Sequence, residues 1–130
     1  NLSIGVAQAL STDYNGKNTP VITGQDATIA GLRNIVDGVQ SMTVFKNVQN
    51  QAEVTAILTE EILAGKTPNE DLLEKIDVEC VYDTTTYDNG IQVVPSYLLT
   101  PVVITIDNLD LLTETDSYKW DENHKYIIDK

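Results

Sequence analysis

Hydrophobic spacing in the first half of the chain alternates between helical stretches and short apolar runs. Residues 2–12 carry leucine, valine and alanine at helical spacing, which predicts an amphipathic helix. Residues 20–23 and 42–45 are short, mostly apolar runs typical of buried strands. Between them, an apolar stripe at helical spacing ends near Gly38 and predicts a second helix. This succession favours parallel strands joined by helical crossovers.

The pattern changes after a third predicted helix, whose apolar stripe begins at Val54 and which ends at Gly65. Residues 67–83 are acidic and weakly periodic, with a short helix predicted at residues 70–75. An Asp-Asn-Gly turn signal at residues 88–90 then separates two candidate strands. These strands are predicted at residues 81–87 and 91–94.

The C-terminal part contains the strongest β-branched run of the chain, residues 102–106, which predicts a strand. Residues 108–113 are predicted to form a short helix. The last stretch, residues 118–130, is rich in charge, and we expect it to be a mobile tail.

Charged residues follow the first two predicted strands directly. Asp26 comes shortly after residues 20–23, and Lys46 follows residues 42–45. If these strands are parallel, both charges reach the carboxyl edge of the sheet, where open α/β sheets bind their ligands. Gln25 and Asn47 flank the pair and could donate further hydrogen bonds.

Each charge has two interpretations. Asp26 could accept hydrogen bonds from two adjacent hydroxyl groups of a ligand, and such charge-assisted bonds are strong. Alternatively, Asp26 or Thr28 caps the following helix. Lys46 could donate to a ligand oxygen and neutralise Asp26 while the site is empty, or it is an ordinary solvated lysine.

Composition excludes several classes of function. The chain has 130 residues, of which 42% are hydrophobic, as expected for one globular domain with a modest core. Its net charge of −12 opposes binding to nucleic acid. The single Cys80 cannot form an internal disulfide, and no Cys/His set has zinc-ligand spacing. Ser96 lacks the surroundings of a catalytic serine and His124 has no partner in view, so neither an enzyme nor a cofactor is expected.

Three segments resemble the periplasmic monosaccharide-binding proteins of ABC importers, in particular the xylose-binding and multiple-sugar-binding branch. They are VITGQDATIAGLRNIVDG at residues 21–38, SMTVFK at residues 41–46, and residues 84–105. The resemblance implies an α/β fold, a three-layer parallel-sheet lobe of the type I periplasmic-binding-protein fold. It also implies that Asp26 contacts sugar, as the aspartate of the GQDA motif does in the family. Xylose-binding relatives carry a sugar-contacting lysine at the place of Lys46.

The same resemblance implies that the fold is incomplete. An Asn-Asp pair that ends a strand precedes the matching stretch in the family, whereas Asn1 is the first residue here. Residues 1–130 would then be a partial C-terminal sugar-binding lobe without its N-terminal lobe. An interlobe crossover would lie near residues 90–105, followed by a charged tail at residues 114–130.

By resemblance, the chain binds a xylose- or glucose-like monosaccharide for carbohydrate transport by an ABC importer. Two lobes would close on the sugar, and a membrane permease would recognise the closed form. One alternative is a sugar-sensing ectodomain that partners a membrane sensor kinase. Another is a fragment that binds no sugar and associates with itself. The expected location is extracytoplasmic, either periplasmic or as a cell-surface lipoprotein, with any signal peptide absent or already removed.

Overall fold

The computed structural model describes residues 2–130, which form two compact units. The first unit runs up to Lys46 and resumes from Val102 to Lys130, and the second is Asn47–Pro101. This division into two units was not predicted from the sequence, which is interpreted above as one partial lobe. Among residues 2–130, no helix combines the length and the apolar character needed to cross a membrane.

A three-stranded sheet organises the first unit, in the order β1-β2-β5. β1 (Thr23–Gln25) and β2 (Met42–Phe45) run parallel, with Thr23 opposite Met42. This confirms the predicted parallel pairing of the first two strands. β5 (Val102–Ile104) pairs with β2 in the antiparallel direction, so the sheet is mixed rather than wholly parallel.

The first strand starts later than predicted. Residues 20–23 were expected to be the strand, but β1 begins only at Thr23. Pro20 has no backbone N–H to donate to a neighbouring strand. Ile22 is buried and accepts a hydrogen bond from the Ser41 N–H (2.8 Å), while Val21 is 78% exposed. β1 ends at Gln25, so the turn after the strand begins at Asp26.

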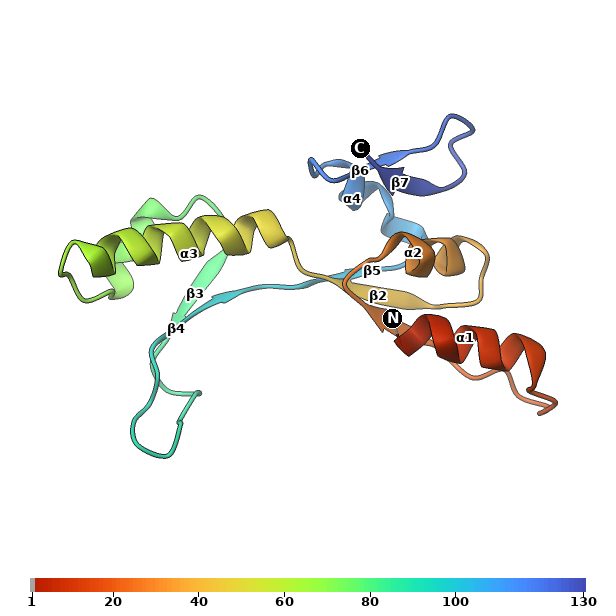
Figure 1. The fold of residues 1–130 in the computed structure, drawn as a ribbon, viewed down its shortest axis with the longest axis horizontal. Coiled ribbons are helices and arrows are strands. Elements are labelled where there is room, and N and C mark those ends of the chain that lie inside the picture. The colour runs from red at the N-terminus through yellow and green to blue at the C-terminus, as the bar shows by residue number, and fades with distance from the viewer. Residues whose placement is uncertain (1) are drawn as a thin grey trace. The chain divides into compact units, whose positions relative to one another are not determined.

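Two helices flank this sheet, α1 (Leu2–Thr12) and α2 (Ile29–Val36), close to their predicted positions. Figure 1 shows α2 on one side of the sheet and α1 on the other. The side chain of Thr28 caps α2 by accepting a hydrogen bond from the Gly31 N–H. Thr28 is thus the cap, which leaves the Asp26 carboxylate free for other contacts.

The C-terminal segment folds onto the same unit. It contains η2 (Ile106–Asn108), α4 (Asp110–Thr113), and a hairpin of β6 (Tyr118–Trp120) and β7 (Ile127–Asp129). Ile127 is only 1% exposed, and β7 packs against α2 (Figure 1). The expectation of a mobile tail is therefore wrong, because this isoleucine belongs to the core. The core consists of Ala27, Leu32, Ile35, Ile104, Leu109, Leu112 and Ile127.

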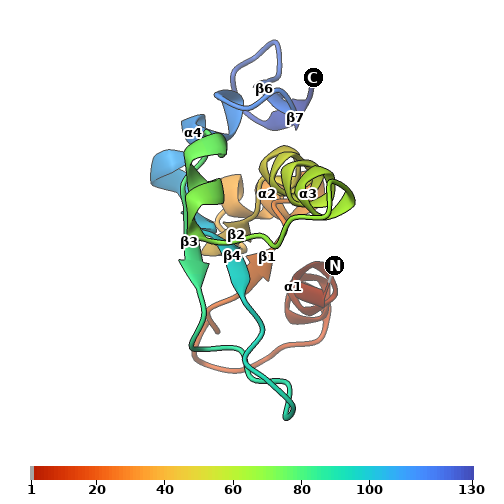
Figure 2. The ribbon, with the colours of Figure 1, turned by 90° about the vertical axis from the view of Figure 1, so that its left-hand side faces the viewer.

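The second unit contains α3 (Val48–Leu63), η1 (Glu70–Lys75) and the antiparallel strands β3 (Cys80–Asp83) and β4 (Ser96–Leu99). Figure 2 shows β3 and β4 side by side. η1 is the short helix predicted at residues 70–75.

The strand expected at residues 91–94 is not formed. Those residues belong to the loop between β3 and β4, which turns at Gly90 (φ 85°). The only ladder contact within this loop is an isolated bridge between Asp88 and Val93.

Candidate functional site

β1 ends in a turn whose two residues both have left-handed backbone conformations, Asp26 with φ 72° and Ala27 with φ 45°. The turn is bonded to β2 at both residues. The Asp26 N–H donates to the Val44 carbonyl (2.7 Å), and the Ala27 N–H donates to Oγ1 of the buried Thr43 (3.3 Å). Because β2 leads directly into Lys46, these bonds place the Asp26 side chain beside that lysine.

The predicted pair of charges is an ion pair in the structure. Lys46 Nζ lies 2.9 Å from Asp26 Oδ1, and the two side chains are 39% and 61% exposed, respectively. An exposed ion pair of this kind contributes about 0–1 kcal/mol to stability. A polar ligand could therefore separate the two groups at little cost and bond to both.

The other two predicted residues have different environments. Gln25 is exposed at the end of β1, next to Asp26. Asn47 begins the second unit, where its Oδ1 caps α3 by accepting hydrogen bonds from the N–H groups of Gln49 (3.0 Å) and Asn50 (3.4 Å). The Asn47 oxygen is thus engaged in capping, and its amide NH₂ is the group available for a ligand.

Sequence reasoning missed Tyr118, which contacts the neighbours of both charges. Its Oη donates to the Ala27 carbonyl (3.1 Å), and its ring meets that of Phe45 edge-on, with centroids 5.9 Å apart. Burial raises the pKa of Tyr118, and the charge of Asp129 raises it further. The alternating aromatic residues of β6 were the available signal, but the surrounding charges favoured a tail.

A second aromatic contact lies in the same hairpin. The His124 ring stacks on the Trp120 indole, with centroids 4.5 Å apart, and Trp120 Nε1 donates to Asp110 Oδ1 (2.8 Å). Trp120 thus packs locally, against His124 and Asp110. His124 is exposed, as expected for a solvated side chain.

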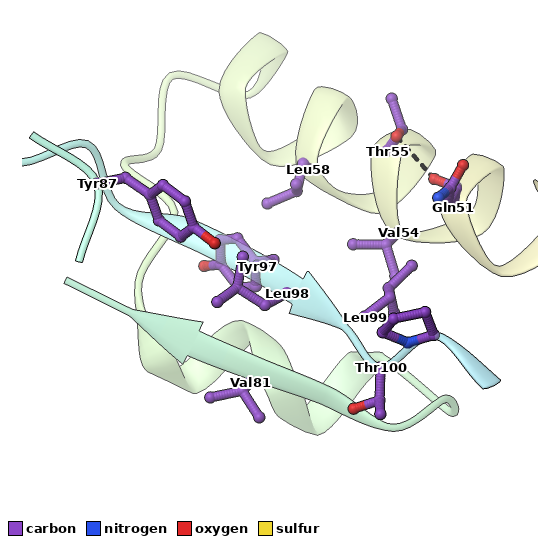
Figure 3. A pocket seen from close by; sticks show the side chains of 11 residues that line it. Gln51, Val54, Thr55, Leu58, Val81, Tyr87, Tyr97, Leu98, Leu99 and Thr100 are labelled. Atoms are coloured by element: carbon purple, nitrogen blue, oxygen red, sulfur yellow. Dashed lines mark hydrogen bonds between the residues drawn. The ribbon is translucent and has the colours of Figure 1, made fainter. Parts of the chain in front are cut away.

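The second unit has a groove of about 750 Å³ between α3 and the β3–β4 pair (Figure 3). Val54 and Leu58 of α3 face Tyr87, Tyr97 and the end of β4 across it. No lysine, arginine, aspartate or glutamate lines this groove. Across residues 2–130, no group of three or more His, Cys, Asp or Glu side chains is placed to hold a metal ion. The Asp26–Lys46 pair is therefore the better candidate for binding a polyhydroxylated ligand.

Comparison with curated proteins finds sugar-binding relatives. The chain is similar to the multiple sugar-binding periplasmic receptor ChvE of Rhizobium radiobacter, with 40% identity over 93% of this chain and 32% of the receptor. It is also 37% identical to the D-xylose-binding periplasmic protein of Escherichia coli, over 81% of this chain and 28% of that protein. The chain thus spans about a third of the length of the curated relatives it matches. No protein-family model matches it.

Solved structures of sugar-binding proteins also align with the chain. An ABC transporter solute-binding protein from Clostridium phytofermentans with bound β-D-glucose aligns with a TM-score of 0.70 and 34% identity, covering 94% of this chain and 34% of that one. A carbohydrate transporter solute-binding protein from Chloroflexus aurantiacus in complex with D-glucose aligns with a TM-score of 0.64 and 30% identity, covering 84% and 28%. These matches confirm the predicted α/β periplasmic-binding-protein fold. In sequence and fold, the chain is a homologue of the sugar-binding solute-binding proteins of ABC transporters, over about a third of their length.

Proposed function

We propose that this chain supplies part of a monosaccharide-binding site, in which Asp26 and Lys46 contact the sugar. The observation that carries the proposal is the exposed 2.9 Å ion pair at the carboxyl end of two parallel strands. Open parallel sheets bind ligands at this edge. The relatives add the chemical class, because their names and bound ligands are D-xylose, D-glucose and multiple sugars.

Both members of the pair suit an uncharged polyhydroxy ligand. The Asp26 carboxylate has oxygens that can accept from two neighbouring hydroxyl groups, and the Lys46 ammonium can donate to a hydroxyl or ring oxygen. Hydrogen bonds to charged groups contribute roughly 1.5–3 kcal/mol each. Without sugar, the two side chains satisfy each other. Gln25 and the Asn47 amide are proposed as additional donors.

The same relatives support a wider role. The protein carrying this chain would be the extracytoplasmic solute-binding component of an ABC sugar importer, acting by binding rather than catalysis. Closure of two lobes over the sugar would present a surface to the membrane permease. The segment near residues 90–105 would form part of the crossover between lobes.

The proposal is tested by isothermal titration of the intact gene product with xylose, glucose, arabinose and galactose. Sorbitol, an open-chain polyol, is the matched control. We expect saturable binding of at least one cyclic sugar and none of sorbitol. Absence of binding to all four sugars by folded protein would contradict the proposal. The 130-residue chain alone should bind more weakly, because it spans about a third of its relatives.

Self-association is a second candidate, favoured by the position of β1 at the edge of its sheet. An edge strand presents unpaired backbone groups to another chain. Nearby, Leu2 of α1 is 89% exposed and Val21 is also exposed. Light scattering of the isolated 130-residue chain would then give a mass above 14.3 kDa, whereas a stable monomer at 14.3 kDa would contradict this candidate.

A further inference from the structure

We propose that Tyr118 is a positioning residue for the sugar site: its hydroxyl fixes the turn at residues 26–27 and thereby orients the Asp26 carboxylate. The link to sugar affinity rests on the proposed function. The link to the geometry of the turn does not, because it follows from the contacts of Tyr118 itself.

The turn needs support because of its backbone conformation. Asp26 (φ 72°) and Ala27 (φ 45°) are consecutive left-handed residues, and neither is glycine. Aspartate adopts this conformation more readily than most residues, but alanine pays the full steric penalty of its Cβ. Such a conformation persists only where the surrounding structure holds it in place.

Three bonds from other elements hold it. The Asp26 N–H is fixed by the Val44 carbonyl and the Ala27 N–H by Thr43 Oγ1, which ties the turn to β2. The Ala27 carbonyl is bonded by Tyr118 Oη from β6. Because Ala27 is 0% exposed, solvent cannot replace that hydroxyl where it stands, and its loss would leave a buried carbonyl unpaired.

Tyr118 is itself held firmly enough to act in this way. It lies on β6, opposite Asp129 of β7, in the hairpin that buries Ile127. Its ring packs edge-on against Phe45, which directly precedes Lys46, while its hydroxyl bonds the residue that directly follows Asp26. One side chain therefore contacts the neighbour of each member of the ion pair.

The first test measures amide hydrogen exchange by NMR in the 130-residue chain carrying Tyr118→Phe. This variant keeps the ring and its contact with Phe45 but removes the hydroxyl. The control is Tyr126→Phe on the same hairpin, whose hydroxyl bonds Asp37 Oδ1 (2.9 Å) instead. We expect faster exchange of the Asp26 and Ala27 amides in Tyr118→Phe only. Unchanged exchange, or the same acceleration in both variants, would overturn the proposal.

The second test measures sugar affinity in the intact gene product. Tyr118→Phe should weaken binding roughly three- to tenfold, the size of one lost hydrogen bond, and Tyr126→Phe should not. Combined with Asp26→Ala, Tyr118→Phe should cause no further loss. An equal loss with and without the Asp26 carboxylate would show a general structural effect and overturn the positioning role. If Asp26→Ala alone leaves affinity unchanged, the proposed sugar site fails, while the exchange result still decides the role of Tyr118 in the turn.

Discussion

Lys46 Nζ lies 2.9 Å from Asp26 Oδ1, although the helix α2 separates the two residues in the sequence. The parallel pairing of β1 with β2 brings the ends of both strands to one edge. The left-handed turn at Asp26 then sets the carboxylate beside the lysine. The ion pair is thus a consequence of strand direction and of one turn.

The C-terminal hairpin should contribute strongly to stability, because Ile127 lies in the core. We expect Ile127→Ala to lower the free energy of unfolding by about 2–5 kcal/mol, measured by urea denaturation. Ile128→Ala is the matched control, since its side chain is only partly buried and should cost less. Equal effects of the two substitutions would show that the hairpin does not anchor the core.

Two glycines should respond to alanine in opposite directions. A Cβ at Gly24 would lie 2.4 Å from Nε2 of the buried Gln40, whose amide donates to the Met42 carbonyl (2.9 Å). Gly24→Ala should therefore destabilise the chain. A Cβ at Gly5, within α1, would meet no atom within 4 Å.

Gly5→Ala should accordingly stabilise the chain by about 0.5–1 kcal/mol through helix propensity. Thermal unfolding of both variants gives the comparison. A Gly24→Ala protein as stable as the wild type would contradict the close packing of Gln40 against β1.

The Asp83 carboxylate should stay ionised at a lower pH than an ordinary aspartate does. Hydrogen bonds from the Thr86 hydroxyl (2.6 Å) and from the N–H groups of Thr85 and Thr86 lower its pKa to about 2. Carbon-detected NMR titration should show Thr86→Val raising the pKa of Asp83 toward its ordinary value. Thr85→Val should raise it less, because the Thr85 hydroxyl is more distant (3.3 Å). A larger effect of Thr85→Val would contradict this order.

The second unit should lose stability in acid through Glu61. Hydrogen bonds from Lys75 (2.6 Å) and Lys66 (3.3 Å) lower the pKa of Glu61 below its ordinary value of 4.5. A carboxyl group whose pKa is lower in the folded than in the unfolded protein stabilises the folded state when the pH is above the unfolded-state pKa. This stabilisation is lost as the pH falls through the folded-state pKa. The difference in unfolding free energy between the wild type and Glu61→Gln should therefore shrink below pH 4.5.

Glu53→Gln serves as the control for Glu61, because within residues 2–130 no ion pair of Glu53 is found. It should leave the acid limb of the stability profile unchanged. A constant difference between Glu61→Gln and the wild type across this pH range would contradict the role of the ion pairs.

Local patterns were sufficient to predict the elements whose apolar residues recur at regular spacing. Helical periodicity predicted α1, and apolar runs separated by a helix predicted the parallel pairing of β1 with β2. From that pairing, the juxtaposition of Asp26 and Lys46 followed directly. The turn glycine and the capping residues also placed the helix ends closely.

The remaining features depend on contacts between distant residues. A β-branched run predicts a strand at β5 but carries no information on its antiparallel direction. The strands of the C-terminal hairpin are three residues each, so the two alternating aromatic residues of β6 were outweighed by the charges around them. The bond of Tyr118 to Ala27 joins residues 91 positions apart, and the left-handed Ala27 is stabilised only by such contacts.

The most direct test of the central claim is the sugar affinity of Asp26→Ala in the intact gene product, measured by isothermal titration with the best-bound cyclic sugar. Removing the carboxylate leaves sugar hydroxyls unpaired, so we expect a loss of about 2–4 kcal/mol, or roughly 30- to 1000-fold. Lys46→Met should also weaken binding. Lys66→Ala, which breaks an ion pair with Glu61 in the second unit, should not. Unchanged affinity in a folded Asp26→Ala protein would contradict the assignment of the sugar site.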